Sequence, residues 1–233
     1  MKKLLLLMVS IFVFNFAPSQ SNPKIENYQF GSLDVEVMIM PFGMEKPVKI
    51  GTMSKTGAID FEVPKALPEL SKETKAVFIS DLAYTLFDVC DNSSEINSNI
   101  TIITSFDTGA LSLWTTDKRY VGVVFAVSDE KMVPWIEDPA YVEPILGSYF
   151  ELIYVAKPFQ YNGECTQTQM LEKGDAKINF NYNLDLKAGY NFIEYKIESI
   201  YKTDPNVMAS FPDKVSVSNV EGIPNCKWIG KYF

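Results

Sequence analysis

The sequence predicts a mainly β protein: an antiparallel β-sandwich, immunoglobulin-like or jelly-roll-like, with a short helix and a long proline-rich loop. Several segments alternate apolar and polar residues with a period of two, the pattern of a strand with one buried face. Turns that contain Gly, Pro or Asn separate these segments at short intervals. About ten short strands spaced in this way are typical of a sandwich or a barrel.

The first residues carry the three parts of a secretory signal peptide. Lys2 and Lys3 precede an apolar run at 4–16, and small residues up to Ser21 then provide sites for cleavage. The apolar run is too short to cross a bilayer, which takes about 20 residues. We therefore predict that residues 1–21 direct export to the periplasm or the extracellular space. An uncleaved N-terminal anchor is the alternative.

Composition excludes several classes of function. The chain has 233 residues and no histidine, which excludes Ser-His-Asp and Cys-His catalysis and histidine-ligated zinc or haem. The net charge is −8, and loss of Lys2 and Lys3 with the signal peptide takes it to −10. Such an acidic chain is not expected to bind nucleic acid. No later apolar run reaches the length of a membrane span, so we expect no membrane insertion after cleavage.

The N-terminal part of the mature chain predicts a small sheet. Residues 33–40 alternate apolar and polar side chains, and strand-like segments follow at 48–53 and 58–63 with a glycine-containing turn between them. We expect an N-terminal β-meander within residues 22–66. The rest of the chain, 67–233, is expected to form the β-sandwich domain.

The next segment is the least regular. A short helix is predicted near 68–75. The apolar segment 76–89 fits either a buried strand or a helix, and a helix is slightly favoured. Residues 90–99 are rich in Asn and Ser, and we expect a polar loop there.

Strand-like patterns resume later in the chain. They predict strands at 100–106, 110–114, 120–127 and 149–156. The segment 132–148 holds three prolines, so we expect a long irregular loop.

The clearest alternation lies near the C-terminus, at 178–186 and 193–197. The glycine-containing segment 187–189 joins these two runs, which together predict an antiparallel hairpin. Short final strands are expected at 215–217 and 226–229.

Three cysteines allow one intramolecular disulfide and leave one free thiol. We favour a bond between Cys165 and Cys226, because both lie beside turn-like residues in the C-terminal half. Cys90 follows an apolar stretch and is interpreted as a small buried side chain. The other two pairings stay open.

An acidic loop offers the candidate metal ligands, Asp88, Asp91 and Glu95. The carboxylate, amide and hydroxyl oxygens of this segment suit calcium, which is the one cofactor we consider. Its spacing does not match an EF-hand, and a solvated polar loop is the favoured interpretation. Paired carboxylates could also serve acid–base or glycoside chemistry.

Aromatic residues are concentrated in the middle of the chain. Trp135 and Tyr141 lie in the proline-rich loop, and Trp114 lies in a predicted strand. Exposed rings on a β scaffold suit stacking on a sugar or a peptide, so these three are the candidate ligand-binding residues. Packing in the core is the alternative, and for aromatic residues the more common role.

Four segments, at 98–126, 151–165, 182–193 and 224–228, resemble a group of exported, β-rich proteins of Gram-negative bacteria that have no assigned activity. Their shared pattern is Tyr-x-Leu-x-Leu-Lys-x-Gly-Trp-Asn, and here Tyr190 stands in place of the Trp. The resemblance implies an exported β architecture and supplies no catalytic residues. The cysteine that anchors some relatives to lipid is missing, so anchoring is not implied.

These observations lead us to expect an exported, non-enzymatic β-sandwich protein that binds a ligand or partner or has a structural role in the envelope. A glycan or another envelope protein is the expected partner. The alternatives are a carboxylate-based glycan-active enzyme and a calcium-stabilised adhesin module.

Overall fold

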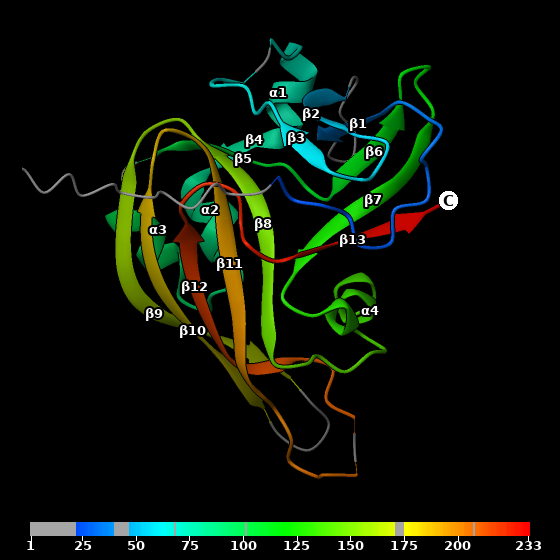
Figure 1. Cartoon of the computed structure of the whole chain (residues 1–233). Helices are drawn as coiled ribbons and strands as arrows, with labels where there is room; N and C mark the ends of the chain where they lie inside the picture. The colour runs from blue at the N-terminus through cyan, green and yellow to red at the C-terminus, as the bar shows by residue number, and fades with distance from the viewer. Residues whose placement is uncertain (1–21, 40–46, 68, 101, 171–174, 207) are drawn as a thin grey trace, which may run out of the picture.

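A computed structural model describes residues 22–39, 47–67, 69–100, 102–170, 175–206 and 208–233. The predicted signal peptide lies outside these residues. The expectation of a mainly β protein is confirmed, because strands account for 49% of the structure and helices for 12%. The strands join in one 13-stranded sheet (Figure 1).

Ten strands follow one another across this sheet in the order β3-β2-β1-β6-β7-β8-β11-β12-β10-β9. The first half contains β3 (Ile59–Phe61), β2 (Val48–Met53), β1 (Val35–Ile39), β6 (Leu111–Thr115) and β7 (Tyr120–Val127). The second half contains β8 (Gly147–Val155), β11 (Gly189–Ile200), β12 (Pro212–Val220), β10 (Ala176–Leu186) and β9 (Phe159–Gln169). Three strands lie off this path: β13 (Lys227–Tyr232) pairs with β7, β4 (Ile79–Asp81) with β5, and β5 (Thr104–Asp107) with β4 and β8.

The helices are short. They are α1 (Lys72–Phe78), α2 (Leu82–Phe87), α3 (Ser93–Asn99), the 3₁₀ helix η1 (Glu130–Met132) and α4 (Val133–Glu137). Two of them occupy segments that we expected to be irregular. In α3, the buried Ile96 fixes one turn of a polar segment against the core. In α4, Pro134 lies in the first turn, where a helix tolerates proline because its N–H would have no partner there.

The two halves of the sheet pack in two layers, as in a sandwich. Alternate residues of β8 and β11 face opposite sides: Ile153 and Ile193 pack against α2 and α3, whereas Leu152 and Phe192 belong to the core of the first half. We call the side towards α2 and α3 the helix face. On the other side, the ring of Phe192 lies 6.1 Å from that of Trp228, whose side chain is fully buried.

The prediction that 178–186 and 193–197 form a hairpin is wrong. Strands β10 and β11 are consecutive, but β12 lies between them, parallel to β10 and antiparallel to β11. The side chain of Asn191 holds the connection open: it accepts a bond from Lys187 N–H and donates to the carbonyls of Lys187 and Gly189. The arch at the top of β10 and β11 in Figure 1 therefore leaves room for a third strand.

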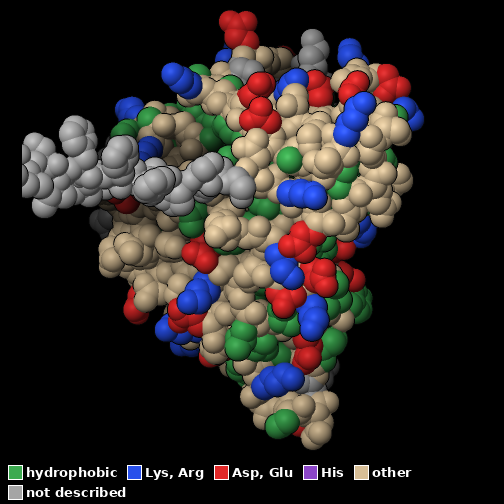
Figure 2. Space-filling view, in the orientation of Figure 1, with side chains coloured by type: hydrophobic (Ala, Val, Ile, Leu, Met, Phe, Trp, Pro, Cys, Tyr) green, Lys and Arg blue, Asp and Glu red, His purple; other side chains and the backbone are tan. Residues whose placement is uncertain are grey.

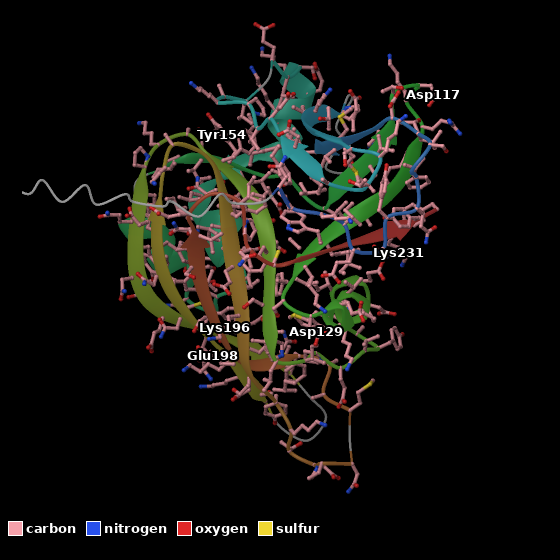
Figure 3. The ribbon with its side chains drawn as sticks, in the orientation of Figure 1. Asp117, Asp129, Tyr154, Lys196, Glu198 and Lys231 are labelled. Carbon is pink, nitrogen blue, oxygen red and sulfur yellow. A yellow bond between two sulfur atoms is a disulfide. The ribbon has the colours of Figure 1, made fainter. Side chains whose placement is uncertain are left out.

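The outward faces carry mixed charge. Lys196 and Glu198 lie on the lower part of β11 (Figure 3), and Glu198 pairs with Lys214 of β12 at 2.8 Å. Acidic and basic side chains are likewise interspersed over the face shown in Figure 2.

The disulfide joins Cys90 to Cys165, so the predicted pairing of Cys165 with Cys226 is wrong. The chain after α2 turns against β9, where Asp91 N–H bonds to the Thr166 carbonyl at 2.8 Å, and this contact brings Cys90 beside Cys165. Cys226 keeps a free thiol, half-buried beside β7, and burial raises the pKa of this thiol to about 12.

We expect the Cys90–Cys165 bond to stabilise the fold by about 2–4 kcal/mol, because it closes a long loop in the unfolded chain. Denaturant unfolding with and without reductant measures the effect. The double variant Cys90→Ala, Cys165→Ala should show the stability of the reduced protein and no response to reductant. Cys226→Ala is the matched control and should respond like the original chain. A Cys226→Ala protein that no longer responds would contradict the assigned pairing.

Candidate functional site

The candidate site is a pocket at the point where the sheet divides. One edge of β8 pairs with β11 along its length, whereas the other edge pairs first with β7, at Tyr149 and Phe150, and then with β5, from Ile153 onwards. In the gap, Thr108 donates from its N–H and its hydroxyl to the Leu152 carbonyl, at 3.3 and 2.7 Å. The strands separate here and leave a notch in the sheet.

The notch opens into a pocket of about 410 Å³. Its walls come from the turn after β5, from β7 and β8, and from α4, and most of its side chains are apolar, including Phe125, Ile136, Phe150, Leu152 and Phe192. Asp107, Glu137 and Glu151 also line the pocket, and no Lys or Arg is among its lining residues. The pocket therefore combines apolar walls with negative charge.

The register of the strands brings Asp107 and Glu151 together. Asp107 of β5 lies opposite Ile153 of β8, and Glu151 is two residues from Ile153 on the same face. Diagonal neighbours of this kind have Cβ atoms roughly 7 Å apart. The Asp107 carboxylate is oriented by the N–H of Gly109, which donates to it at 2.9 Å.

Glu151 has an unusual acidity. Its side chain is exposed to water at the pocket, but neighbouring protein atoms still remove part of the hydration of the carboxyl. This desolvation, together with the negative charge of Asp107, raises the pKa of Glu151 to about 7. The group is therefore divided between its neutral and charged forms at physiological pH, which is characteristic of functional carboxyls.

Two tyrosines extend the site along the helix face. Tyr149 stacks on Tyr195 of β11 with ring centroids 5.0 Å apart. Burial, and then the charge of Glu151, raise the pKa of both hydroxyls well above the usual value. Both groups therefore stay protonated and can donate hydrogen bonds.

The third acidic group is already paired. Glu137 at the end of α4 forms an ion pair with Lys231, which is labelled in Figure 3. Lys231 belongs to β13, the strand that pairs with β7. Glu137 thus fixes α4 against the sheet, and Asp107 and Glu151 supply most of the unbalanced charge of the pocket.

The structure does not gather the three predicted aromatic residues. Trp135 is only 9% exposed: its indole N–H donates to the Ser210 carbonyl at 2.9 Å, and its ring lies 6.0 Å from that of Tyr149. Trp114 packs against Tyr120 at 5.4 Å. Tyr141, 76% exposed, is the one of the three that faces water freely. Trp135 therefore serves the core, and supports the pocket through Tyr149.

The predicted calcium ligands are also separate. Among the described residues, no group of three or more Asp, Glu, Cys or His side chains is placed to hold a metal. The Asp91 carboxylate instead accepts the N–H and the hydroxyl of Thr168, at 3.0 and 2.6 Å, and these bonds lower its pKa. Asp88 ends α2, and Glu95 lies in α3.

Sequence reasoning missed Asp107 and Glu151. A signal was present for Glu151, because it occupies a position whose neighbours in the alternation, Tyr149, Ile153 and Val155, all face the helices. A carboxyl on the inward side of a strand is unusual. The pairing of β5 with β8, which brings Asp107 close, has no comparable signal in the sequence.

Comparison with protein-family models, with curated proteins and with solved structures found no match to this chain. None of the helices in the described residues is long and apolar enough to pass through a membrane.

We expect Glu151→Gln to stabilise the protein at high pH only. The raised pKa means that the folded state binds more protons than the unfolded state between about pH 4.5 and 7, so stability falls as pH rises through this window. The variant removes that loss. Because water reaches the carboxyl, the gain at pH 8 should be about 1 kcal/mol, with little gain at pH 4.

Denaturant unfolding of the two proteins from pH 4 to pH 8 measures this difference. Glu221→Gln removes a carboxyl that does not line the pocket and is the control. A constant difference between Glu151→Gln and the original chain at every pH would contradict the raised pKa.

Trp135→Ala should destabilise the protein by about 3–5 kcal/mol, because it leaves a cavity and removes a hydrogen bond. Tyr141→Ala should change stability by less than about 0.5 kcal/mol, as exposed positions generally do. Thermal or denaturant unfolding of both variants tests the assignment. Similar small effects would mean that Trp135 is not a core residue.

Proposed function

We propose that the protein is an exported, non-enzymatic binding protein whose ligand occupies the pocket between β5, β7 and β8. The observation that carries this proposal is the pocket itself, where apolar walls surround Asp107 and Glu151. Ligand sites are usually apolar concavities with a few convergent polar groups. The signal-peptide pattern of residues 1–21 supports export.

The chemistry of the walls selects an organic cation with an apolar body. The two carboxylates attract positive charge, and no basic side chain lines the pocket to compete. The rings of Phe125, Tyr149 and Phe150 suit contact with an apolar group, and aromatic faces also attract cations.

Phenethylamine and phenethyl alcohol test this choice, because they share an aromatic body and differ in charge. Isothermal titration calorimetry should show binding of the amine and at least roughly tenfold weaker binding of the alcohol. Glu151→Gln and Asp107→Asn should each weaken binding of the amine, and Glu221→Gln should not. Equal binding of both compounds, or binding unaffected by the pocket variants, would refute a cation site.

Binding of the amine should also depend on pH. A cation interacts best with ionised Glu151, so its affinity should rise about tenfold between pH 6 and pH 8. Glu151→Gln should abolish the rise. The same titrations at three pH values measure this dependence. An affinity of the original chain that does not change with pH would show that Glu151 does not contribute to binding.

A second candidate is a carboxylate-based enzyme that acts on glycans. It is favoured by one observation: Asp107 and Glu151 share a pocket, and the pKa of Glu151, at about 7, suits a general acid. Diagonal neighbours on two paired strands can place their carboxyl groups within the roughly 5–9.5 Å that separates the carboxyl groups of glycosidase pairs. Hydrolysis of a glycan by the original chain, lost in both Glu151→Gln and Asp107→Asn, would establish this candidate and displace the first.

A further inference from the structure

Strand β9 has a free edge. This strand runs from Phe159 to Gln169 and ends the sheet, with β10 on its inner side. Edge strands present unpaired backbone groups that can pair with another chain, and proteins usually protect them.

Here the protection covers only part of the edge. Asp91, in the connection between α2 and α3, bonds through its N–H to the Thr166 carbonyl and through its carboxylate to the Thr168 N–H. These bonds also show which backbone groups point outwards. Along a strand, the backbone N–H and C=O groups of successive residues point alternately to its two edges. The N–H and C=O groups of Gln160, Asn162 and Glu164 therefore point outwards as well.

No described residue forms a backbone hydrogen bond with those outward groups of Gln160, Asn162 and Glu164. The open part of the edge spans the five residues from Gln160 to Glu164, about 16 Å of strand. It is long enough to pair with a short extended peptide.

A groove of about 620 Å³ runs beside this open edge. Its lining includes five apolar or aromatic side chains, Ile96, Ile100, Ile103, Phe159 and Tyr161, together with the polar or charged Asn92, Glu95, Lys157 and Gln160. The ring of Tyr161 is held against Phe87 of α2, with centroids 4.7 Å apart. The groove therefore offers apolar contacts on the helix face of the edge.

The other face of the same edge is acidic. Glu164 is exposed and, with Asp91 and Asp213, lines a second hollow on β9 and β10. The one basic lining residue, Lys214, pairs with Glu198 and also interacts with the charge of Glu164, so three carboxylates of the hollow face a single lysine. A strand laid along the edge would direct alternate side chains to the apolar groove and to this acidic face.

We propose that the edge of β9 from Gln160 to Glu164 binds an extended peptide segment of a partner protein as an added strand, with apolar and basic residues in alternation. Backbone hydrogen bonds to the edge pair the peptide with β9. The apolar groove contacts its apolar side chains, and the acidic face contacts its basic side chains. This is the recognition mode of strand addition. Charge complementarity with Glu164 and the acidic chain favours a basic partner over a second copy of the same chain.

The test uses the peptide acetyl-Val-Lys-Ile-Lys-Val-amide, labelled for fluorescence anisotropy. We expect saturable binding, and at least roughly tenfold weaker binding of a peptide with the same side chains but methylated backbone nitrogens, which cannot donate to the edge. A Val-Glu-Ile-Glu-Val peptide should not bind. Equal binding of the methylated peptide, or no binding of the first, would overturn the proposal.

Variants of the edge give the matched controls. Asn162→Pro removes an outward N–H and should abolish binding, whereas Asn162→Ala keeps the N–H and should bind normally. Near-ultraviolet circular dichroism shows whether the proline variant is folded. Glu164→Lys, at an exposed position, should invert the preference to the acidic peptide whether or not the proline variant folds.

Unchanged binding in a folded Asn162→Pro protein, or no change of preference in Glu164→Lys, would overturn the proposal. So would a dimer in size-exclusion chromatography that Asn162→Pro dissociates, because the edge would then serve a second copy.

Discussion

The fold depends on the fact that one edge of β8 forms hydrogen bonds with two different strands, β7 and β5. One edge of β8 pairs with β11 throughout. The opposite edge pairs with β7 at Tyr149 and Phe150 and with β5 from Ile153 onwards. The division lets one continuous sheet turn back on itself, so that Trp228 and Phe192 meet on one side while α2 and α3 cover the other. The carbonyl of Leu152 would lose its partner at the division, and Thr108 supplies one.

The same division explains why the pocket is both apolar and acidic. Where two strands separate, the side chains that would have filled a core face a space instead, and a carboxyl can be accommodated because water enters. Glu151 lies between these two environments, exposed to solvent yet partly desolvated by the protein beside it, and its raised pKa reflects this position and the nearby charge of Asp107. Tyr149, which lines the pocket, is packed between Tyr195 and Trp135.

Local patterns in the sequence predicted the β class and most strands, because alternation reports which face of a strand is buried. The alternation of 178–186 was read correctly as a strand, but it carried no information about its neighbour. The insertion of β12 depends on the Asn191 side chain and on matching apolar positions far along the chain. The pairing of Cys90 with Cys165, and the proximity of Asp107 to Glu151, are likewise long-range consequences of topology. Strand β9 was missed, because Gly163, Gln167 and Gln169 weaken its apolar face.

The position of β12 also has a consequence for the order of assembly. When β9, β10 and β11 have been synthesised, the arch between the last two is present but its middle is empty, and β10 has no neighbour on that side. The C-terminal layer cannot close until residues 212–220 arrive and fit between two strands at once. Contacts of this non-local kind make folding slow. The C-terminal layer is therefore completed by a strand that follows both of its neighbours in the chain.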